Sequence, residues 1–304
     1  MLVTHCDADG KTCLVLAKKF LKNIGRYRIC DYGNVNEIVT EYLDTIEEHQ
    51  NDDTVLIITD ISISKDVAER IDSMKNMFSF LLLIDHHPDN DYILREYDWC
   101  KLYPSDTSAT KALYNYLKNM GLVMNNDYDE LVTAVDEWDT WKWEDTGNPN
   151  AKIINDLAYN LKTHDYLNRF LVNPSLTLSK REKLILSRRA DNIQIAINKL
   201  KPIINGKTCY VFVDRYVAEV TIHIFETYKD IDILIAINPV NNSISYRSRL
   251  DKYDVSGIAT RNGGGGHKKA SGSPIIKGIG IGLIDTILND GYRDYSKEAY
   301  VINE

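Results

Sequence analysis

The stretch Leu-Leu-Leu-Ile-Asp-His-His-Pro, residues 81–88, decides both the fold class and the position of the site. Its apolar run ends abruptly in a carboxylate and two imidazoles. A short apolar run that is bounded by a turn residue is typical of a strand buried on both faces. Because ligands bind outside the carboxyl ends of strands in open α/β sheets, Asp85 and His86 are expected to point into a site. Aspartate and histidine together suit manganese, zinc or iron rather than calcium.

Two earlier apolar runs, residues 2–4 and 55–59, end in the same way. The polar groups that follow them are His5, Asp7, Asp9 and Asp60. Helix-like sequence between the runs predicts a βαβ alternation, which places the strands parallel with their ends along one edge. Carboxylates that lie close together stay ionised only if cations neutralise them. The repetition therefore predicts a metal site at this edge.

Length and composition are those of an ordinary soluble protein. The chain has 304 residues, 44% of them hydrophobic and 26% charged, which allows two domains with sizeable cores. No apolar run approaches the roughly 20 residues of a membrane span, and a candidate ligand at His5 leaves no room for a signal peptide. The five cysteines are scattered and lack CxxC spacing, which argues for a reducing compartment. We expect a cytoplasmic protein without a membrane partner.

The charge is unevenly distributed along the chain. The net charge is −8, yet residues 246–269 hold six basic residues against two acidic ones. An acidic N-terminal half would suit metals, and this basic segment would suit a phosphate chain. A long polynucleotide would need a wider basic surface, so a short anionic substrate fits better.

Hydrophobic periodicity predicts an α/β fold with two domains and a helical connector. In the first domain we expect strands over about 54–59, 78–84 and 99–103, and helices over 35–49, 65–76, 108–119 and 127–139. Ser64 is a plausible N-cap for the second of these helices. In the second domain we expect strands around 208–214, 232–238 and 243–249, with helices around 216–228, 255–260 and 279–289. The predicted divisions are 1–149, a connector over 150–204, and 205–304.

Five motifs in order carry a family resemblance. His5-Cys6-Asp7-Ala8-Asp9-Gly10, Asp60, Asp85-His86-His87 and Asp139 resemble the four motifs of the DHH phosphoesterase superfamily. The segment Gly-Gly-Gly-Gly-His-Lys-Lys-Ala-Ser-Gly, residues 263–272, resembles the glycine-rich signature of its associated C-terminal domain. The resemblance covers almost the whole chain. Asp139-Thr140-Trp141 and Asp254-Val255-Ser256 are most similar to the bacterial oligoribonucleases, or nanoRNases, of that superfamily.

The resemblance implies a parallel-sheet metal domain with two manganese ions and a smaller mixed α/β domain that binds the nucleotide. One metal would take His5, Asp7 and Asp60, and the other would take Asp9, Asp60, His86 and Asp139, so that Asp60 bridges them. Asp85 would orient an imidazole, and His87 would lie near the scissile phosphate as a polar or acidic group. Asp136, three residues before Asp139 on the same helical face, remains an alternative; the family pattern favours Asp139.

Substrate contacts are expected in the second domain. Arg247 and Arg261 are the best candidates for bidentate phosphate clamps. The glycine run lacks a GK[ST] sequence and does not follow a strand as GxGxxG, so it is neither a P-loop nor a Rossmann fingerprint. Glycines beside basic residues can nevertheless present backbone N–H groups to an anion. The further candidates for phosphate or base binding are therefore Gly264, Gly265, Gly266, His267 and Ser271.

These features predict a manganese-dependent phosphodiesterase that hydrolyses short RNA or DNA oligonucleotides, linear dinucleotides included, to mononucleotides. Alternatives within the same chemistry are a 3′-phosphonucleotide phosphatase and a cyclic-dinucleotide phosphodiesterase. An inorganic pyrophosphatase shares the ligand set, but the arginine-bearing second domain points to nucleotides. From a different class, a nucleotide-sensing module without catalysis stays open. Nucleic-acid preference, polarity and assembly state, with a homodimer among the options, are also open.

Overall fold

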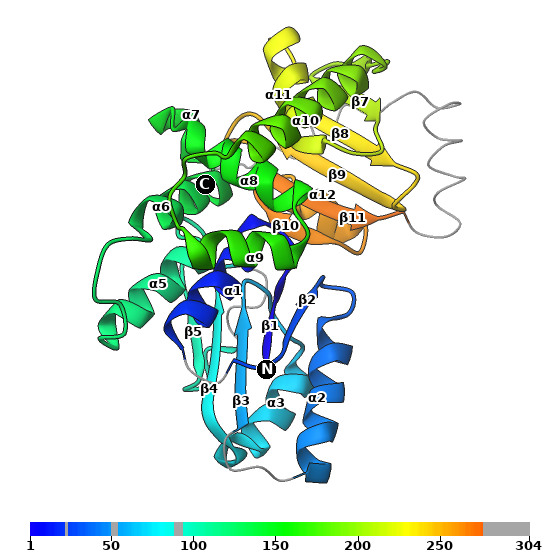
Figure 1. Ribbon diagram of the computed structural model, residues 1–304. Coiled ribbons are helices and arrows are strands. Elements are labelled where there is room, and N and C mark those ends of the chain that lie inside the picture. Colours follow the sequence, from blue (N-terminus) through cyan, green and yellow to red (C-terminus); the bar gives the residue numbers. More distant parts are fainter. Residues whose placement is uncertain (22–23, 50–53, 88–93, 276–304) are drawn as a thin grey trace. The chain divides into compact units, whose positions relative to one another are not determined.

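The computed structural model describes residues 1–304 except 22–23, 50–53, 88–93 and 276–304, and its chain divides into two compact units (Figure 1). Unit 1 is Met1–Ser187 and unit 2 is Arg188–Glu304. Among the helices that the structure describes, none is both long enough and apolar enough to cross a bilayer. The predicted two-domain α/β class is confirmed, with a parallel sheet in the first unit and a mixed sheet in the second.

The sheet of unit 1 has the strand order β2-β1-β3-β4-β5, and every described pairing in it is parallel. The strands are β1 (Leu2–His5), β2 (Tyr27–Cys30), β3 (Thr54–Thr59), β4 (Phe78–Asp85) and β5 (Cys100–Leu102). All six residues of β3 are buried, as are the last four of β4. The strands bury both faces because helices cover the sheet on both sides. Because these strands run parallel, their carboxyl ends meet at one edge, as predicted.

Helices α2 (Val35–His49) and α3 (Lys65–Ser73) cover one face of this sheet, and α1 (Ala8–Phe20) and α5 (Ala109–Asn119) cover the other (Figure 1). Alternate residues of β3 enter two separate cores: Ile57 packs with α1 and α5, and Ile58 packs with α2 and α3. The period-two alternation of a strand produces this division. Helices α6 (Asp129–Asp139), α7 (Trp143–Thr146), α8 (Pro149–Asn160) and α9 (Thr163–Val172) complete the unit.

Side-chain caps fix where several of these helices begin. The hydroxyl of Ser64 accepts from the backbone N–H of Val67 at 3.5 Å, which confirms the predicted cap of α3. Asp7 caps α1 by accepting from the N–H of Gly10 at 3.0 Å. A Cβ at Gly10 would collide with the carbonyl of His5, so this turn requires glycine.

The long helix α10 (Lys180–Asn198) contains the division between the units, which falls after Ser187. Its Leu186 packs against the core of unit 1. The predicted boundaries near 149 and 204 stay predictions.

Unit 2 is built on a six-stranded sheet with the order β10-β11-β9-β8-β7-β6. Its strands are β6 (Ile203–Asn205), β7 (Thr208–Phe212), β8 (Ile233–Asn238), β9 (Ser243–Ser248), β10 (Gly265–His267) and β11 (Ala270–Pro274). Only β7 and β8 pair in parallel; the other described pairs are antiparallel. One face packs on α11 (Val217–Thr227) and the other on α12 (Ser256–Arg261). The helix predicted over 279–289 lies outside the described residues.

Candidate metal centre and substrate-binding residues

The carboxyl ends of β1, β3 and β4 bring the predicted ligands of unit 1 together. Asp60 follows β3 in a left-handed conformation with φ 58°, which aspartate tolerates better than most residues. Its backbone N–H donates to the carbonyl of Ile84 at 2.9 Å, across the neighbouring strand. The side chain is only 1% exposed. The turn therefore directs a buried carboxylate along the edge of the sheet, between the residues that end β1 and those that end β4.

One group of three donors consists of His5, Asp7 and Asp60, whose ligand atoms all lie within 4.8 Å of one another. His5 Nδ1 lies 2.9 Å from Asp7 Oδ2 and 3.7 Å from Asp60 Oδ2. Asp7 uses its other oxygen to cap α1. This is the set that the family resemblance implies for one metal.

A second group consists of Asp9, His86 and Asp139, again within 4.8 Å of one another. His86 Nε2 lies 3.6 Å from Asp9 Oδ2, 3.4 Å from Asp139 Oδ2 and 3.4 Å from Asp60 Oδ1. Asp9 is held in place by the first turn of α5, because its two oxygens accept from the N–H groups of Ala109 at 2.8 Å and Thr110 at 2.7 Å. Asp60 thus places one oxygen toward each group.

The structure separates Asp139 from its alternative, Asp136. Asp136 is buried and accepts from the N–H of Ser108 at 2.9 Å and from the ammonium of Lys111 at 2.7 Å. It belongs to none of the donor groups found in the described residues. Asp139, one turn later on α6, lies beside His86. The geometry therefore favours Asp139 as the metal ligand.

Asp85 orients His87. The Asp85 side chain is fully buried, and its Oδ1 lies 2.8 Å from His87 Nδ1 and accepts from the N–H of His86 at 2.9 Å. Its Oδ2 accepts from the hydroxyl of Ser62. Asp85 therefore engages Nδ1 of His87 and not its other ring nitrogen, Nε2. His87 also lies within ligand distance of Asp60 and His86, so its predicted role beside the phosphate stays a prediction.

Buried oxygen atoms test whether these residues fit a cation. Both carboxylate oxygens of Asp60 and Oδ2 of Asp139 are buried and have no hydrogen-bond partner among the described residues. Burying a carboxylate without donors is costly unless a cation pairs with it. The donor set, nitrogen and carboxylate oxygen without sulfur, suits divalent ions such as Mn²⁺. The residues therefore fit divalent metal ions.

The titration behaviour of these groups has the same cause. Burial, together with the neighbouring carboxylates, raises the pKa of Asp60 and of Asp139 well above the usual value. Burial alone would lower the pKa of His5 and of His86, but nearby aspartates outweigh burial and raise both. The raised pKa of each of these four groups favours its protonated form when no cation is present.

Two residues after β2 were not predicted to belong to this region. Asp31 lies near His5, with 3.7 Å between its Oδ1 and His5 Nε2. The ring of Tyr32 lies 5.7 Å from that of His5 and 5.7 Å, edge-on, from that of His87. The signal was present: Cys30 ends a strand and an acid follows, as with Asp60. The short half-exposed β2 lacks the long apolar run that marks the other strands.

Unit 2 contains the predicted substrate-binding residues. Arg247 lies on β9, and its Nη1 donates to the carbonyls of Tyr246 at 2.9 Å and Ser271 at 3.2 Å. Ser271 is buried and its hydroxyl donates to the carbonyl of Val255. Arg261, at the end of α12, is exposed. The assignment of Arg247, Arg261 and Ser271 to substrate binding stays a prediction.

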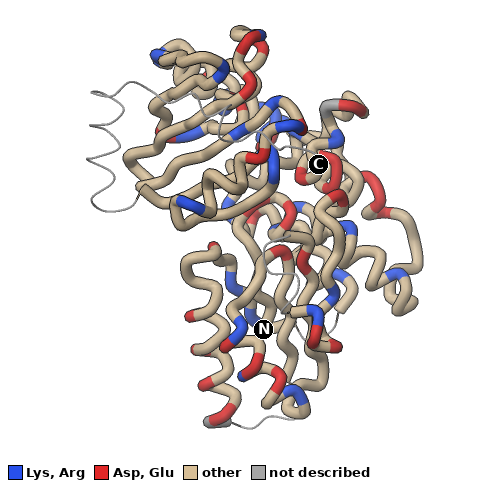
Figure 2. Tube along the Cα trace, turned by 180° about the vertical axis from the view of Figure 1, so that it is seen from behind, with Lys and Arg blue, Asp and Glu red and all other residues tan. Residues whose placement is uncertain are grey.

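The glycine run has a structural requirement of its own. Gly265, Gly266 and His267 form β10 and pair with β11. A Cβ at Gly264 would collide with the carbonyl oxygen of Gly272, so the backbones approach too closely for any side chain. Close packing thus explains at least one of the four glycines, and anion binding by Gly264, Gly265, Gly266 and His267 stays a prediction. In Figure 2 basic and acidic residues are interspersed along both units.

Known proteins resemble both the sequence and the fold. The chain is 28% identical over 290 residues to oligoribonuclease NrnB of Bacillus subtilis, covering 90% of this chain and 72% of that protein. It is 26% identical over 184 residues to a 3',5'-cyclic-nucleotide phosphodiesterase of Helicobacter pylori, covering 56% of this chain and 50% of that protein. The structure of the pGpG-specific phosphodiesterase PggH from Vibrio cholerae matches with a TM-score of 0.51 and 16% identity, covering 95% of this chain and 99% of that one. Residues 1–137, which contain all the donors described above except Asp139, match the profile of the DHH family, N-terminal domain. The N-terminal part of the chain is therefore similar to the DHH family, and most of the chain is similar to an oligoribonuclease.

Proposed function

We propose that the protein is a manganese-dependent phosphodiesterase that hydrolyses short oligonucleotides, including linear dinucleotides, to mononucleotides. The observation that carries the proposal is the position of Asp60, whose two buried oxygens each face one of two histidine-aspartate groups. A shared carboxylate between two donor sets is suited to a pair of cations. The similarity to an oligoribonuclease over 90% of the chain supports the substrate class.

Under this proposal, His5, Asp7 and Asp60 hold one ion and Asp9, Asp60, His86 and Asp139 hold the other. Two such ions, when bound, would stabilise the charge on the phosphoryl oxygens and lower the pKa of a water toward neutrality. The protein itself supplies positioning. Asp9 is fixed by α5, and the turn at Asp60 is fixed by its bond to Ile84.

Asp85 and His87 would together donate a proton to the leaving oxygen. The carboxylate holds Nδ1 of the imidazole, so a proton on Nε2 could be given to the departing ribose oxygen. Burial would lower the pKa of His87, but the charge of Asp85 and its hydrogen bond raise it. This favours the protonated imidazole that a general acid requires.

The test is a product analysis of 5′-labelled RNA from two to about twelve nucleotides long, with manganese and with a chelator. Rapid manganese-dependent conversion of the shortest members to mononucleotides is expected, because short substrates need only the limited basic segment of unit 2. Activity that is unaffected by chelation, or that increases toward the longest substrates, would contradict the proposal.

A cyclic phosphodiester is the second candidate substrate. The Helicobacter pylori relative carries the name of a 3',5'-cyclic-nucleotide phosphodiesterase, although this chain spans half of its length. The same metal groups could act on either bond. A parallel assay with 3′,5′-cyclic nucleotides and cyclic dinucleotides decides between them: the better substrate is the one with the larger kcat/KM.

Replacing Arg247 with alanine is expected to raise KM about tenfold and to leave kcat nearly unchanged, because the guanidinium would bind a phosphate remote from the reacting phosphorus. Steady-state kinetics on a dinucleotide measures both constants. A loss confined to kcat would exclude this role.

Arg249→Ala is the matched control for Arg247→Ala. Arg249 lies two residues further along, and its Nη2 donates to the carbonyls of Phe225 at 2.7 Å and Tyr228 at 3.0 Å, where α11 ends. Its loss is expected to lower the melting temperature of the protein without a selective change in KM. A KM increase equal to that of Arg247→Ala would indicate a general disturbance of unit 2.

Metal affinity is expected to increase with pH. The folded protein without metal retains protons on Asp60, Asp139, His5 and His86 that the unfolded chain releases at lower pH. Its stability should therefore fall as the pH rises from the usual carboxyl range, about 4, through the raised pKa values. Cations bind the deprotonated groups and displace these protons.

The corresponding measurement is calorimetric titration with Mn²⁺ in two buffers of different ionisation enthalpy, at about pH 6 and about pH 8. Proton release on binding and tighter binding at the higher pH are expected. Binding that releases no protons would show that these groups are not the ligands. Thermal unfolding of the metal-free protein at both pH values checks the stability half of the prediction.

A further inference from the structure

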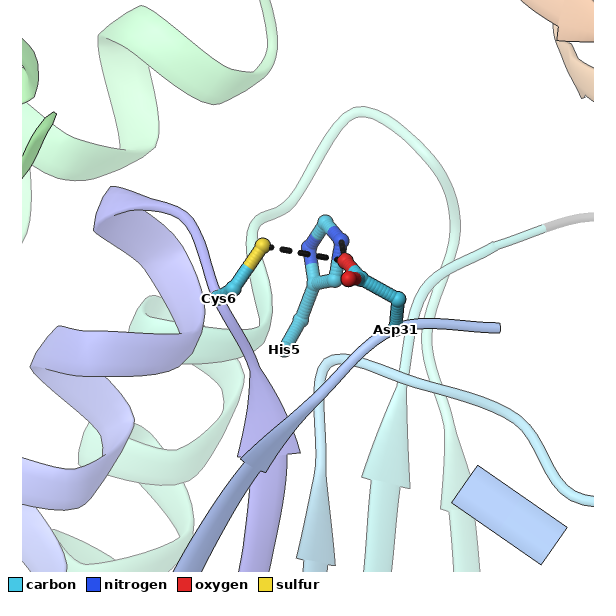
Figure 3. A group of neighbouring side chains, drawn as sticks. All are labelled: His5, Cys6 and Asp31. Carbon is cyan, nitrogen blue, oxygen red and sulfur yellow. Dashed lines mark hydrogen bonds and ion pairs between the residues drawn. The ribbon is translucent and has the colours of Figure 1, made fainter. Parts of the chain in front are cut away.

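A thiol and a carboxylate lie near the second ring nitrogen of His5, Nε2. The thiol of Cys6 donates to Asp31 Oδ1 at 3.1 Å, and His5 Nε2 lies 3.7 Å from the same oxygen (Figure 3). Imidazole, thiol and carboxylate offer ligand atoms that are all within 4.8 Å of one another. His5 Nδ1 lies instead beside Asp7 and Asp60. One imidazole therefore stands between two donor groups.

We propose that Cys6, His5 Nε2 and Asp31 form a separate binding site for a soft divalent cation, Zn²⁺ in particular, and that its occupation opposes the metal centre. Tetrahedral zinc with sulfur at 2.3 Å and nitrogen or oxygen near 2.0 Å keeps its ligands about 3.3–3.6 Å apart. The two separations at Asp31, 3.1 and 3.7 Å, bracket that range. Small side-chain movements would close the site around an ion.

The fold places these donors together at the end of β1 and β2. His5 is paired in register with Cys30, so the next residues of the two strands, Cys6 and Asp31, diverge from the same point of the sheet. The Asp31 side chain is 69% exposed, which gives an ion access from solvent and leaves water to complete the coordination. On binding, the thiol loses its proton to solvent and the thiolate becomes the ligand.

Ligand type separates this site from the metal centre. A thiolate favours Zn²⁺ and disfavours Mn²⁺, which prefers oxygen donors. His5 couples the two sites, because a neutral imidazole that binds a cation through one nitrogen carries its proton on the other. When Nε2 binds zinc, Nδ1 carries the proton. It can then no longer bind a cation together with Asp7 and Asp60. Zinc at this site should therefore inhibit in competition with manganese; this consequence for activity rests on the proposed function.

Cobalt binding tests the site without any assay of activity. A cobalt–thiolate bond absorbs in the near ultraviolet, whereas cobalt held by nitrogen and oxygen alone does not. Titration of the full chain with Co²⁺ is expected to produce this band in the parent protein and in the control variants Cys100→Ser and Asp98→Asn. The band should be absent in Cys6→Ser and require more cobalt in Asp31→Asn. Zinc added afterwards should abolish it.

Two results of this titration would overturn the proposal. One is a parent protein without the band, which would mean that Asp31 only orients the His5 ring, as carboxylates beside metal-binding histidines do. The other is a band that persists in Cys6→Ser, which would place the thiolate elsewhere. Circular dichroism of each variant confirms that it is folded.

A zinc titration of hydrolysis tests the coupling. With saturating manganese, the zinc concentration that halves activity is expected to be about tenfold higher for Cys6→Ser than for the parent protein, each relative to its own zinc-free rate. Equal inhibition of both would locate the effect of zinc in the metal centre and refute the coupling. If no variant hydrolyses any substrate, the proposed function fails, while the cobalt band still decides whether the site exists.

Discussion

Replacing Asp60 with asparagine is expected to lower kcat on the order of 10³-fold, with weaker binding of both metal ions. The side chain is 1% exposed, and its oxygens face His5 Nδ1 at 3.7 Å and His86 Nε2 at 3.4 Å. Asparagine keeps the shape but replaces one oxygen with an amide donor and removes the charge that the two groups share. Steady-state kinetics and metal content after dialysis measure the two effects.

Asp60→Asn should act in the opposite direction on the metal-free protein. Burial and the charges of Asp7 and Asp9 raise the pKa of Asp60, which means that its ionised form is disfavoured in the folded state. A neutral amide removes that cost, so the melting temperature of the metal-free variant should rise at neutral and alkaline pH. Loss of activity with a gain in stability is typical of a functional group held in an unfavourable environment.

Asp156→Asn is the matched control for Asp60→Asn. Asp156 is also buried, but it pairs with Lys152 at 2.6 Å within α8 and belongs to no donor group in the described residues. Its replacement should leave turnover and metal content unchanged. If Asp60→Asn retains the parent turnover with a full complement of metal, Asp60 is not a shared ligand.

The sheet and its donor-bearing edge were predictable because the signals are local. Long apolar runs before Asp60 and Asp85 mark central strands, and parallel connections bring strand ends to one edge whatever the loops between them. The predicted strands over 54–59 and 78–84 correspond to β3 and to all but the last residue of β4. Strand direction alone therefore placed these two residues beside the ligands after β1.

The features that the sequence did not predict depend on tertiary contacts. The strands β10 and β11 are short and rich in glycine, so they show no alternation of apolar and polar residues. Which imidazole Asp85 orients depends on the turn after β4, and the geometry selects His87. Asp136 and Asp139 have the same sequence signal, because both are acids on one helical face. The family pattern around Asp139 favoured it over Asp136, and the packing of α6 places Asp139 beside His86 and Asp136 beside Ser108 and Lys111.

The substitutions Asp139→Asn and Asp136→Asn are expected to have opposite effects on activity and on stability. Asp139 Oδ2 is buried 3.4 Å from His86 Nε2 and has no hydrogen-bond partner in the part of the chain that the structure describes. If Asp139 is a metal ligand, Asp139→Asn should cost on the order of 10²-fold in kcat and lower the metal affinity. Its stability without metal should not fall, because burial and nearby acids already raise the pKa of Asp139.

Asp136→Asn should instead reduce the stability of the fold and leave kcat nearly unchanged. Its carboxylate accepts from the N–H of Ser108 at 2.9 Å and from Lys111 at 2.7 Å, so an amide group would place a donor against one of these donors. The expected cost is about 1–3 kcal/mol of unfolding free energy. Denaturant unfolding and kinetics on both variants complete the comparison.

The two acids lie one turn apart on α6, so a general disturbance of the helix would affect both variants alike. Ligation by Asp139 instead predicts loss of metal in Asp139→Asn and loss of stability in Asp136→Asn. The opposite pattern would assign the ligand to Asp136.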